Sequence, residues 1–342
     1  MTDLPDHNKS FSLHAMALDW SPNWTAIFGR EARIILEIGF GNGIFLEGLS
    51  RKHPDANIVG VERAHVPLHW TEKRVQQEKL SNVRLVAADG LMALSCLFEP
   101  ESISEAHMNF SDPWHKRKHH QRRLVNDKLL AVLGSRTKPG GLIYIATDIT
   151  PYAQEIHTSL NRTPGIENAF PEKWMHQRED SSIVTHYEKK AVQAGRTCYY
   201  FKYRRSDAPI AHPPSVKELT PMPNTLLHLP YSLQNIVDSF ERRIIQHDDR
   251  LVKILAVYQQ PGAEKLLFEV LVQEPLFDQR FMVTLSRRDT AENEKAYLLQ
   301  MGSTGYPRAT RGVHDAVYDL MEWLLALDPA AKIINSTVLA PK

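Results

Sequence analysis

The feature that most constrains the fold is an alternation of short apolar runs with amphipathic stretches over the first 150 residues. The apolar runs occupy residues 33–39, 57–62, 83–88, 106–110 and 142–146. Patterns with helical spacing separate them, the clearest over 44–52 and over the residues before Lys79. Apolar runs of this length between helices are typical of βαβ units, in which right-handed crossovers join parallel strands. We therefore expect an α/β fold with a mostly parallel, doubly wound sheet.

A proline-rich stretch interrupts this pattern. Residues 206–230 hold six of the chain's 21 prolines, which argue against a helix or a central strand and are typical of an extended linker. Beyond the linker, helical spacing over 232–247 precedes four strand-like runs, an amphipathic helix over 310–327 and a last strand over 332–339. Consecutive strands followed by a helix predict a smaller α+β domain. The expected organisation is an N-terminal arm (1–30), an α/β domain (31–205), the linker (206–230) and an α+β domain (231–342).

Composition excludes several classes of protein. The chain of 342 residues carries 41 Lys and Arg against 40 Asp and Glu, so no overall charge indicates a nucleic-acid or membrane partner. No run approaches the roughly 18 consecutive apolar residues of a membrane-spanning helix. Residues 1–20 lack the basic start and apolar run of a signal peptide, and two cysteines, Cys96 and Cys198, are too few for a disulfide framework. We expect a soluble, cytoplasmic protein.

A glycine-rich turn follows the first apolar run. Gly39, Gly41 and Gly43 lie between that run and the helical pattern that begins at residue 44. Glycines let the backbone turn tightly and approach a ligand closely, and open α/β sheets bind their ligands at this edge. The sequence therefore predicts a ligand site at the turn.

Three acids mark the ends of successive apolar runs: Glu37, Glu62 and Asp89. The glycine spacing is GxGxG, which differs from the GxGxxG of dinucleotide-binding turns. Glu37, directly before the turn, would also repel a pyrophosphate. Acids at three strand ends suit S-adenosylmethionine, which carries positive charge and no phosphate. The alternative is an ordinary glycine turn with surface acids.

An acidic turn and a basic run follow the fourth apolar run. The turn, residues 109–114 (NFSDPW), places Asp112 and Trp114 on either side of a stiffening proline. The next nine residues, 115–123, hold five Lys or Arg and three His. Basic groups of this kind bind the phosphates of nucleic acids. The alternative is a solvated charged face at the start of a helix that we expect from about residue 121 to 135. We expect no metal at these histidines.

In this order, the motifs resemble those of the bacterial tRNA (guanine-N7-)-methyltransferase family. A later segment, Thr185-His186-Tyr187-Glu188, is similar to the T-x-[FY]-E signature of that family, although His186 stands where a lysine is frequent. The resemblance covers roughly residues 18–205. It implies a Rossmann-like class I methyltransferase fold, S-adenosylmethionine as cofactor and tRNA as partner. It also implies methylation of guanine N7 at position 46, in the variable loop.

The resemblance further implies roles for individual residues. The residues that would contact S-adenosylmethionine are Glu37, Gly39, Gly41, Gly43, Glu62, Asp89 and Asp112. Asp112 would also be the catalytic residue. The residues that would contact the RNA are Lys116, Asp148, Thr185, His186, Tyr187 and Glu188. From the residues alone, the favoured interpretations are that Asp148 is a helix cap and that Thr185 and Glu188 form a capping box.

Two other functions stay open at this point. One is a methyltransferase with a different RNA acceptor, and the other is a catalytically silent RNA-binding or scaffold module on the same fold. Trp114 is expected either to stack on the target base or to pack against its own turn. The sequence does not decide between a monomer and a homodimer. It assigns no role to residues 207–342, although 14 basic against 16 acidic residues over 210–342 argue against a dominant phosphate-binding surface.

Overall fold

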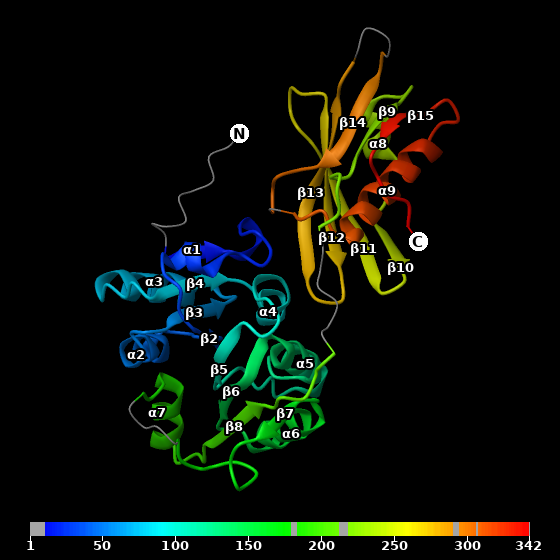
Figure 1. Cartoon of the computed structure of the whole chain (residues 1–342). Coiled ribbons are helices and arrows are strands. Elements are labelled where there is room, and N and C mark those ends of the chain that lie inside the picture. The colour runs from blue at the N-terminus through cyan, green and yellow to red at the C-terminus, as the bar shows by residue number, and fades with distance from the viewer. Residues whose placement is uncertain (1–10, 179–182, 212–217, 290–293, 306, 342) are drawn as a thin grey trace. The chain divides into compact units, whose positions relative to one another are not determined.

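The structure is a computed structural model that describes residues 11–178, 183–211, 218–289, 294–305 and 307–341. The chain divides into two units, residues 1–215 and 216–342. Figure 1 draws the first from blue to green and the second from yellow-green to red. The division falls within the proline-rich stretch that the sequence predicts to be a linker.

An eight-stranded sheet forms the centre of the first unit. Its strands are β1 (Ser12–His14), β2 (Ile34–Ile38), β3 (Asn57–Glu62), β4 (Val83–Ala87), β5 (Ile103–Asn109), β6 (Thr137–Thr147), β7 (Ile166–Asn168) and β8 (Tyr199–Arg205). Their order across the sheet is β1-β4-β3-β2-β5-β6-β8-β7. The pairs formed among β1–β6 are parallel, and β8 runs antiparallel to β6 and β7. The strand order reverses between β2 and β5, which is the point where open α/β sheets bind ligands.

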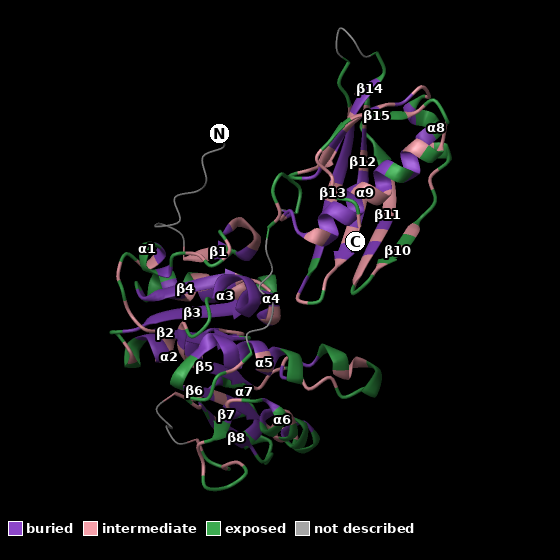
Figure 2. Ribbon diagram, turned by 45° about the vertical axis from the view of Figure 1, so that its right-hand side comes forward, coloured by how far each residue is buried: buried purple, intermediate pink, exposed green. Residues whose placement is uncertain are grey.

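Helices cover both faces of this sheet. They are α1 (Trp24–Phe28), α2 (Ile44–Lys52), α3 (His65–Gln77), α4 (Gly90–Leu97), α5 (Asp127–Arg136), α6 (Thr150–Arg162) and α7 (His186–Gln193), with short 3-10 turns at η1 (Ala15–Ala17) and η2 (Arg117–Arg122). Phe45 and Leu49 of α2 and Val75 of α3 pack in one cluster with Ile35 and Ile58 of the sheet. Figure 1 shows α2 and α3 on one face and α4, α5 and α6 on the other, and Figure 2 shows the central strands buried between them.

Two parts of the first unit differ from the expectation. The helix expected from about residue 121 begins only at Asp127, because Asn126 caps it by accepting a hydrogen bond from the Leu129 amide (3.0 Å). Residues 117–122 form the 3-10 turn instead. The expected N-terminal arm also contributes a strand, since β1 pairs in parallel with β4.

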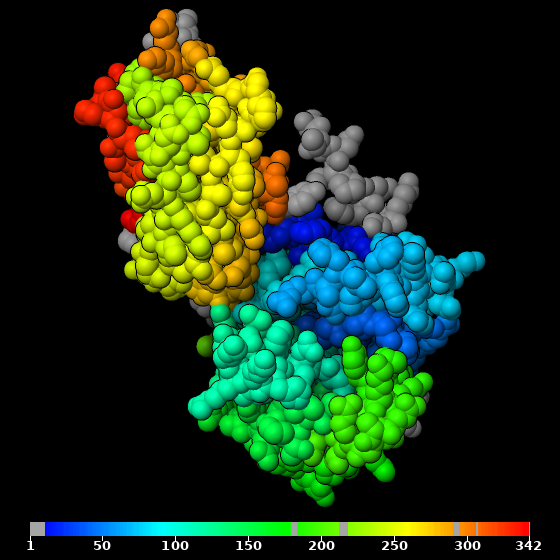
Figure 3. Space-filling view, turned by 180° about the vertical axis from the view of Figure 1, so that it is seen from behind, coloured from blue at the N-terminus to red at the C-terminus, as the bar shows by residue number. Residues whose placement is uncertain are grey.

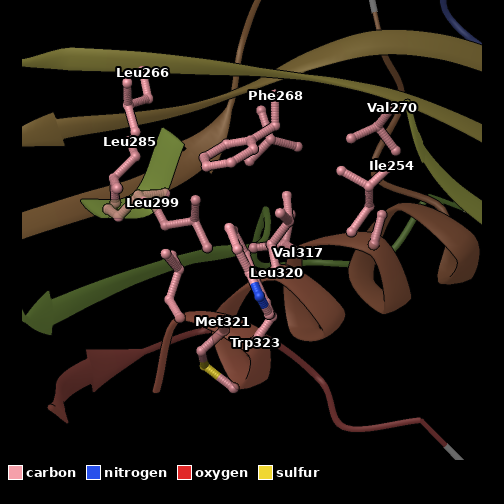
Figure 4. Packing of buried hydrophobic residues seen from close by; sticks show 14 of the residues in the cluster. Ile254, Leu266, Phe268, Val270, Leu285, Leu299, Val317, Leu320, Met321 and Trp323 are labelled. Atoms are coloured by element: carbon pink, nitrogen blue, oxygen red, sulfur yellow. The ribbon is translucent and has the colours of Figure 1, made fainter. Parts of the chain in front are cut away.

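The second unit is built on a seven-stranded antiparallel sheet. Its strands are β9 (Asn224–His228), β10 (Arg243–His247), β11 (Arg250–Gln259), β12 (Lys265–Gln273), β13 (Asp278–Arg287), β14 (Ala296–Met301) and β15 (Lys332–Ser336). The order is β10-β11-β12-β13-β14-β9-β15. The helices are α8 (Leu233–Asp238) and α9 (Arg311–Ala326). Val317 and Leu320 of α9 pack against Phe268 and Leu285 of the sheet, as Figure 4 shows.

Two expectations for this unit were wrong. The linker expected to run to residue 230 ends earlier, because β9 pairs between β14 and β15 and Pro223 and Pro230 lie outside the strand. The helix expected over 232–247 ends at Asp238, and its last five residues form β10. Asp248, with a φ of 46°, lets the chain turn back so that all of β10 pairs with β11. Tertiary pairing therefore overrides the helical spacing.

None of the helices in the described part of the chain has the length and apolar character that crossing a membrane requires.

Candidate active site

The glycine turn connects β2 to α2 and packs directly against α3. Gly39, Gly41 and Gly43 take φ values of 78°, 54° and 73°, in a region that L side chains rarely adopt. A Cβ atom at Gly43 would lie 2.4 Å from Cγ2 of Thr71. The Thr71 hydroxyl donates a hydrogen bond to the carbonyl oxygen of Gly41 (3.1 Å). The turn thus needs glycine at position 43, and α3 fixes its conformation.

A cleft of about 400 Å³ opens at the carboxyl ends of the strands beside this turn. Among the residues singled out from the sequence, those that line it are Gly39, Glu62, Asp89, Asp112, Trp114 and, from the basic run, Arg122 and Arg123. Glu62 ends β3, and the others follow β2, β4 and β5. The volume is in the range of small-molecule sites. The fold therefore brings three of the predicted acids to one space.

Glu62 and Asp89 hold the backbone around the cleft. Oε2 of Glu62 accepts a hydrogen bond from the Gly41 amide (3.2 Å), and Oε1 accepts from the amides of the next two residues (2.9 Å each). Oδ1 of Asp89 accepts from the Leu91 amide (2.9 Å) and caps α4. A carboxylate offers about four acceptor positions. Each side chain therefore keeps acceptor capacity for a ligand.

Asp112 and Trp114 follow β5, where the backbone makes a constrained turn. The side chain of Asp112 is exposed. Trp114 has a φ of 42°, and the Arg122 guanidinium lies over its ring, 5.2 Å from the centroid. The His119 ring lies beside it, with the ring centroids 5.8 Å apart. Of the two expectations for Trp114, this structure shows packing within its own segment.

Arg123, at the end of the basic run, has a different role from its neighbours. Its side chain is only 6% exposed, and its Nε donates a hydrogen bond to the carbonyl oxygen of Pro113 (2.6 Å). It also forms an ion pair with Glu155 of α6. Lys116 and Arg122, by contrast, are exposed. The run therefore combines one buried residue that fixes the turn of Asp112 with surface cations.

Glu37 does not line the cleft but lies in a buried polar cluster next to it. Only 1% of the residue is exposed. Its Oε1 accepts a long hydrogen bond from Nδ2 of Asn109 (3.5 Å), and its Oε2 has no hydrogen-bond partner among the residues that the structure describes. Burial raises the pKa of Glu37 to about 8, and the Asn109 hydrogen bond and Arg178 oppose that rise. A ligand that contacts this carboxyl must therefore enter a closed region.

Arg178 is the centre of the same cluster. Its Nη2 donates hydrogen bonds to Oδ1 of Asn109 (3.1 Å) and Oε2 of Glu188 (3.0 Å). Its guanidinium lies over the rings of Phe45 and Tyr200, 5.1 and 5.0 Å from their centroids. The Tyr200 hydroxyl donates to Oε1 of Glu188 (2.7 Å). Arg178 thus joins the end of β5 to α7.

Thr185 and Glu188 begin α7 with a capping box, so that interpretation is confirmed. Thr185 Oγ1 accepts from the Glu188 amide (3.0 Å), and the Glu188 carboxylate accepts from the Thr185 amide (3.4 Å). His186 and Tyr187 are exposed, the latter to 55%, and the Tyr187 ring lies beside the glycine turn, with its Cε2 3.9 Å from where a Cβ at Gly41 would stand.

Asp148, the other candidate cap, does not cap α6. The N-cap residue there is Ile149, with no side-chain hydrogen bond. The carboxylate of Asp148 instead pairs with Arg196, with 3.0 Å between Nη1 and Oδ2. The capping interpretation of Asp148 was therefore wrong, because an arginine that follows α7 takes the carboxylate.

Sequence reasoning missed the two arginines that organise the site. Arg178 belongs to no recognised motif, and Arg123 was counted only as part of a basic run. Their partners lie up to 69 residues away for Arg178 and up to 32 for Arg123. A local pattern carries no signal for contacts over such separations.

A doubly wound sheet with a glycine turn at its switch point, and with acids at or just after the ends of β3, β4 and β5, fits an α/β methyltransferase of the S-adenosylmethionine-dependent class. A family model described as "Putative methyltransferase" matches residues 31–201. A tRNA (guanine-N(7)-)-methyltransferase of Burkholderia lata is 36% identical over 187 residues, which are 55% of this chain and 72% of that relative. The enzyme of the same name from Paraburkholderia xenovorans is 34% identical over 187 residues, or 55% of this chain and 71% of its own. The chain belongs to the tRNA (guanine-N(7)-)-methyltransferase family.

Among solved structures, the 16S rRNA methyltransferase KamB aligns with 54% of this chain and 92% of its own length, with 10% identity and a TM-score of 0.42.

Proposed function

We propose that this chain transfers a methyl group from S-adenosylmethionine to N7 of guanine in tRNA, at position 46 of the variable loop. The observation that carries the proposal is the cleft, in which Glu62, Asp89 and Asp112 surround one space at the switch point of the sheet. The exposed cations that follow Asp112 give that space a basic border suited to RNA phosphates. Membership of the family supports the reaction and the substrate.

The residues of the cleft fit S-adenosylmethionine. Glu62 and Asp89 present carboxylate oxygens, which are partners for ribose hydroxyls and for an ammonium group. At Gly39 a Cβ would meet its nearest neighbour, Leu124, only at 3.8 Å, so the turn leaves space where the ligand approaches the backbone. When bound, S-adenosylmethionine supplies a methyl group made electrophilic by a sulfonium.

Guanine N7 carries a free lone pair on the Hoogsteen edge, so it needs no general base to act as a nucleophile. The task of the chain is to align N7 with the methyl group and to stabilise the positive charge that develops on the purine. Asp112 is the carboxylate placed for this second task, because it lines the cleft and is exposed. Arg123 is its positioning residue, through the carbonyl oxygen of Pro113.

The residues that the family associates with the RNA divide into two groups here. Lys116, His186 and Tyr187 are exposed, so we assign direct RNA contacts to them. Thr185 and Glu188 face inward through the capping box and the Arg178 ion pair, so we assign to them the placement of α7. Asp148 also contributes to the placement of α7, because it forms an ion pair with Arg196, three residues beyond the helix.

The test is methyl transfer from labelled S-adenosylmethionine to unmodified tRNA transcripts with and without a guanine at position 46. Label that appears as N7-methylguanosine, and only in the transcript with the guanine, supports the proposal. Label in both transcripts would refute the position. Salt-sensitive tRNA binding without any incorporation would refute the activity and favour a silent RNA-binding module.

A further inference from the structure

The solvent side of α3 exposes a large aromatic side chain. Trp70 and Val66, one helical turn apart, are each 66% exposed. The opposite side of the helix holds Thr71 and Val75, which are buried. Large apolar side chains grouped on a surface mark interaction sites more often than single ones do. Val66 and Trp70 therefore form an apolar group on the solvent side of α3, opposite the side that packs into the core.

The charges beside Trp70 are positive and unpaired. Arg63 and Lys73 are exposed, and neither has an ion-pair partner within the described ranges; the His69 imidazole is exposed beside them. Arg74 of the same helix differs, since it forms an ion pair with Glu47 (2.9 Å). The outward stripe of residues 66, 69, 70, 73 and 77 contains no acid. This side of α3 thus combines an aromatic ring with cations free to bind phosphate.

The position of α3 places this surface beside the cleft. Arg63, which precedes the helix, lines the cleft itself. Thr71, the neighbour of Trp70, donates its hydrogen bond to the glycine turn. From Val66 to Lys73 the helix advances about 10 Å, a distance spanned by one or two nucleotides. Figure 3 shows α3, in light blue, on the surface of the first unit.

We propose that the outer side of α3, formed by Arg63, Val66, His69, Trp70 and Lys73, binds a single-stranded segment of the RNA substrate. Trp70 stacks on an unpaired base, and Arg63 and Lys73 bind the flanking phosphates. A protein partner is the poorer fit, because a stable interface buries about 800 Å² on each side, whereas this stripe offers two apolar side chains among cations. The inference rests on the proposed function and extends the RNA contact from the cleft, which Arg63 lines, to the outer side of α3.

The first test measures the affinity of the full chain for an unmodified tRNA transcript by fluorescence anisotropy. Stacking of a base on an aromatic ring predicts that Trp70→Ala weakens binding about tenfold. Trp70→Phe should retain most of the affinity, because it keeps an aromatic face. Trp70→Leu is the matched control for a merely apolar contact and should bind as weakly as the alanine variant.

The second test measures how the same affinity depends on salt. Lys73→Ala should reduce the magnitude of the slope of log K against log[salt] by about 1, which corresponds to the loss of one phosphate contact. Lys332→Ala removes an exposed lysine from β15 of the second unit and should leave the slope unchanged. In methyl-transfer assays, Trp70→Ala should raise KM for tRNA and leave kcat within about twofold at saturation.

These outcomes separate this inference from the proposed function. A wild-type chain that binds tRNA through Trp70 but transfers no methyl group would refute the methylation and retain the RNA contact. Unchanged tRNA affinity in a folded Trp70→Ala variant would overturn the inference. If that variant also sediments as a smaller species than the wild type, the side of α3 belongs to contacts between copies of this chain, which overturns the inference too.

Discussion

Two polar regions lie at the same edge of the first sheet and differ in their access to solvent. The open cleft has a volume of about 400 Å³ and is lined by Glu62, Asp89 and the exposed Asp112. The closed cluster around Arg178 and Glu188 borders a cavity of about 80 Å³, and the Glu188 side chain is 8% exposed. Both regions contain carboxylates, but those of the cleft reach solvent, whereas Glu37 and Glu188 are buried.

This difference in exposure separates residues that can contact substrate from residues that position them. In the cleft, the carboxylates reach solvent and keep free acceptor positions. In the closed cluster, each charge needs a fixed partner, because a buried unpaired charge is strongly destabilising. Substitutions in the cleft should therefore affect turnover, whereas substitutions in the cluster should affect folding. Four experiments test that division.

The largest effect is expected at Arg178. Arg178→Met leaves the Glu188 carboxylate buried without its cation, which should lower the free energy of unfolding by about 3–5 kcal/mol. Urea unfolding at neutral pH measures this change. Arg196→Met is the matched control, because its ion pair with Asp148 involves an arginine side chain that is 48% exposed, and its loss should cost at most about 1 kcal/mol. Equal losses in both variants would contradict the special role of the closed cluster.

A substitution of Asp112 tests the role of the open cleft in turnover. Asp112→Asn should lower kcat by about 10²–10³-fold, since it removes the charge that stabilises the cationic purine. The free energy of unfolding should stay within about 0.5 kcal/mol of the wild type, because the side chain is exposed. Single-turnover kinetics and calorimetric titration with S-adenosylmethionine measure the two properties. A loss of S-adenosylmethionine affinity as large as the loss of turnover would count against stabilisation of the transition state.

The same comparison shows what the sequence can predict about the site. Glu62, Asp89 and Asp112 each follow an apolar run, and parallel strands bring the ends of such runs to one edge. Pattern and topology together were therefore enough to predict the acids of the cleft. The closed cluster depends on Arg178, whose contact with Asn109 spans 69 residues and follows no period. Long-range contacts of single side chains are decided by packing, which a local pattern does not contain.

The same limit of local sequence patterns applies to the prediction of the fold. The runs that predict β3 and α2 agree with the structure residue for residue, because β3 is a short continuous apolar run, typical of a strand buried on both faces, and α2 has helical spacing. In the second unit the errors fall at β9 and β10, whose neighbours in the sheet decide their conformation. In β10, residues with helical spacing form a strand because β11 offers a full set of backbone partners. Such pairing is a property of the assembled sheet.

The pH dependence of the free energy of unfolding tests the burial of Glu37 in the closed cluster. The folded chain keeps this carboxyl protonated up to about pH 8, whereas the unfolded chain releases the proton near its ordinary pKa of 4.5. Between these values the folded state binds more protons, so the free energy of unfolding should fall as the pH rises, by at most about 1.4 kcal/mol per pH unit. Glu37→Gln removes the titration and should flatten this part of the curve. Parallel curves for the two proteins, measured by urea unfolding from pH 5 to 9, would contradict the burial of Glu37.

Of the four experiments, the one on Thr185 should show the smallest effect. It tests whether Thr185 belongs with the closed cluster or with the open cleft. Thr185→Ala removes the side-chain cap of α7 and should lower the free energy of unfolding by about 1 kcal/mol. Thr185→Ser keeps the hydroxyl and should retain most of that stability. If Thr185 acts only through the cap, both variants should methylate tRNA with the wild-type KM well below their melting temperatures. A raised KM for tRNA in the alanine variant alone would show that the hydroxyl also contacts the RNA, and would place Thr185 in the open region.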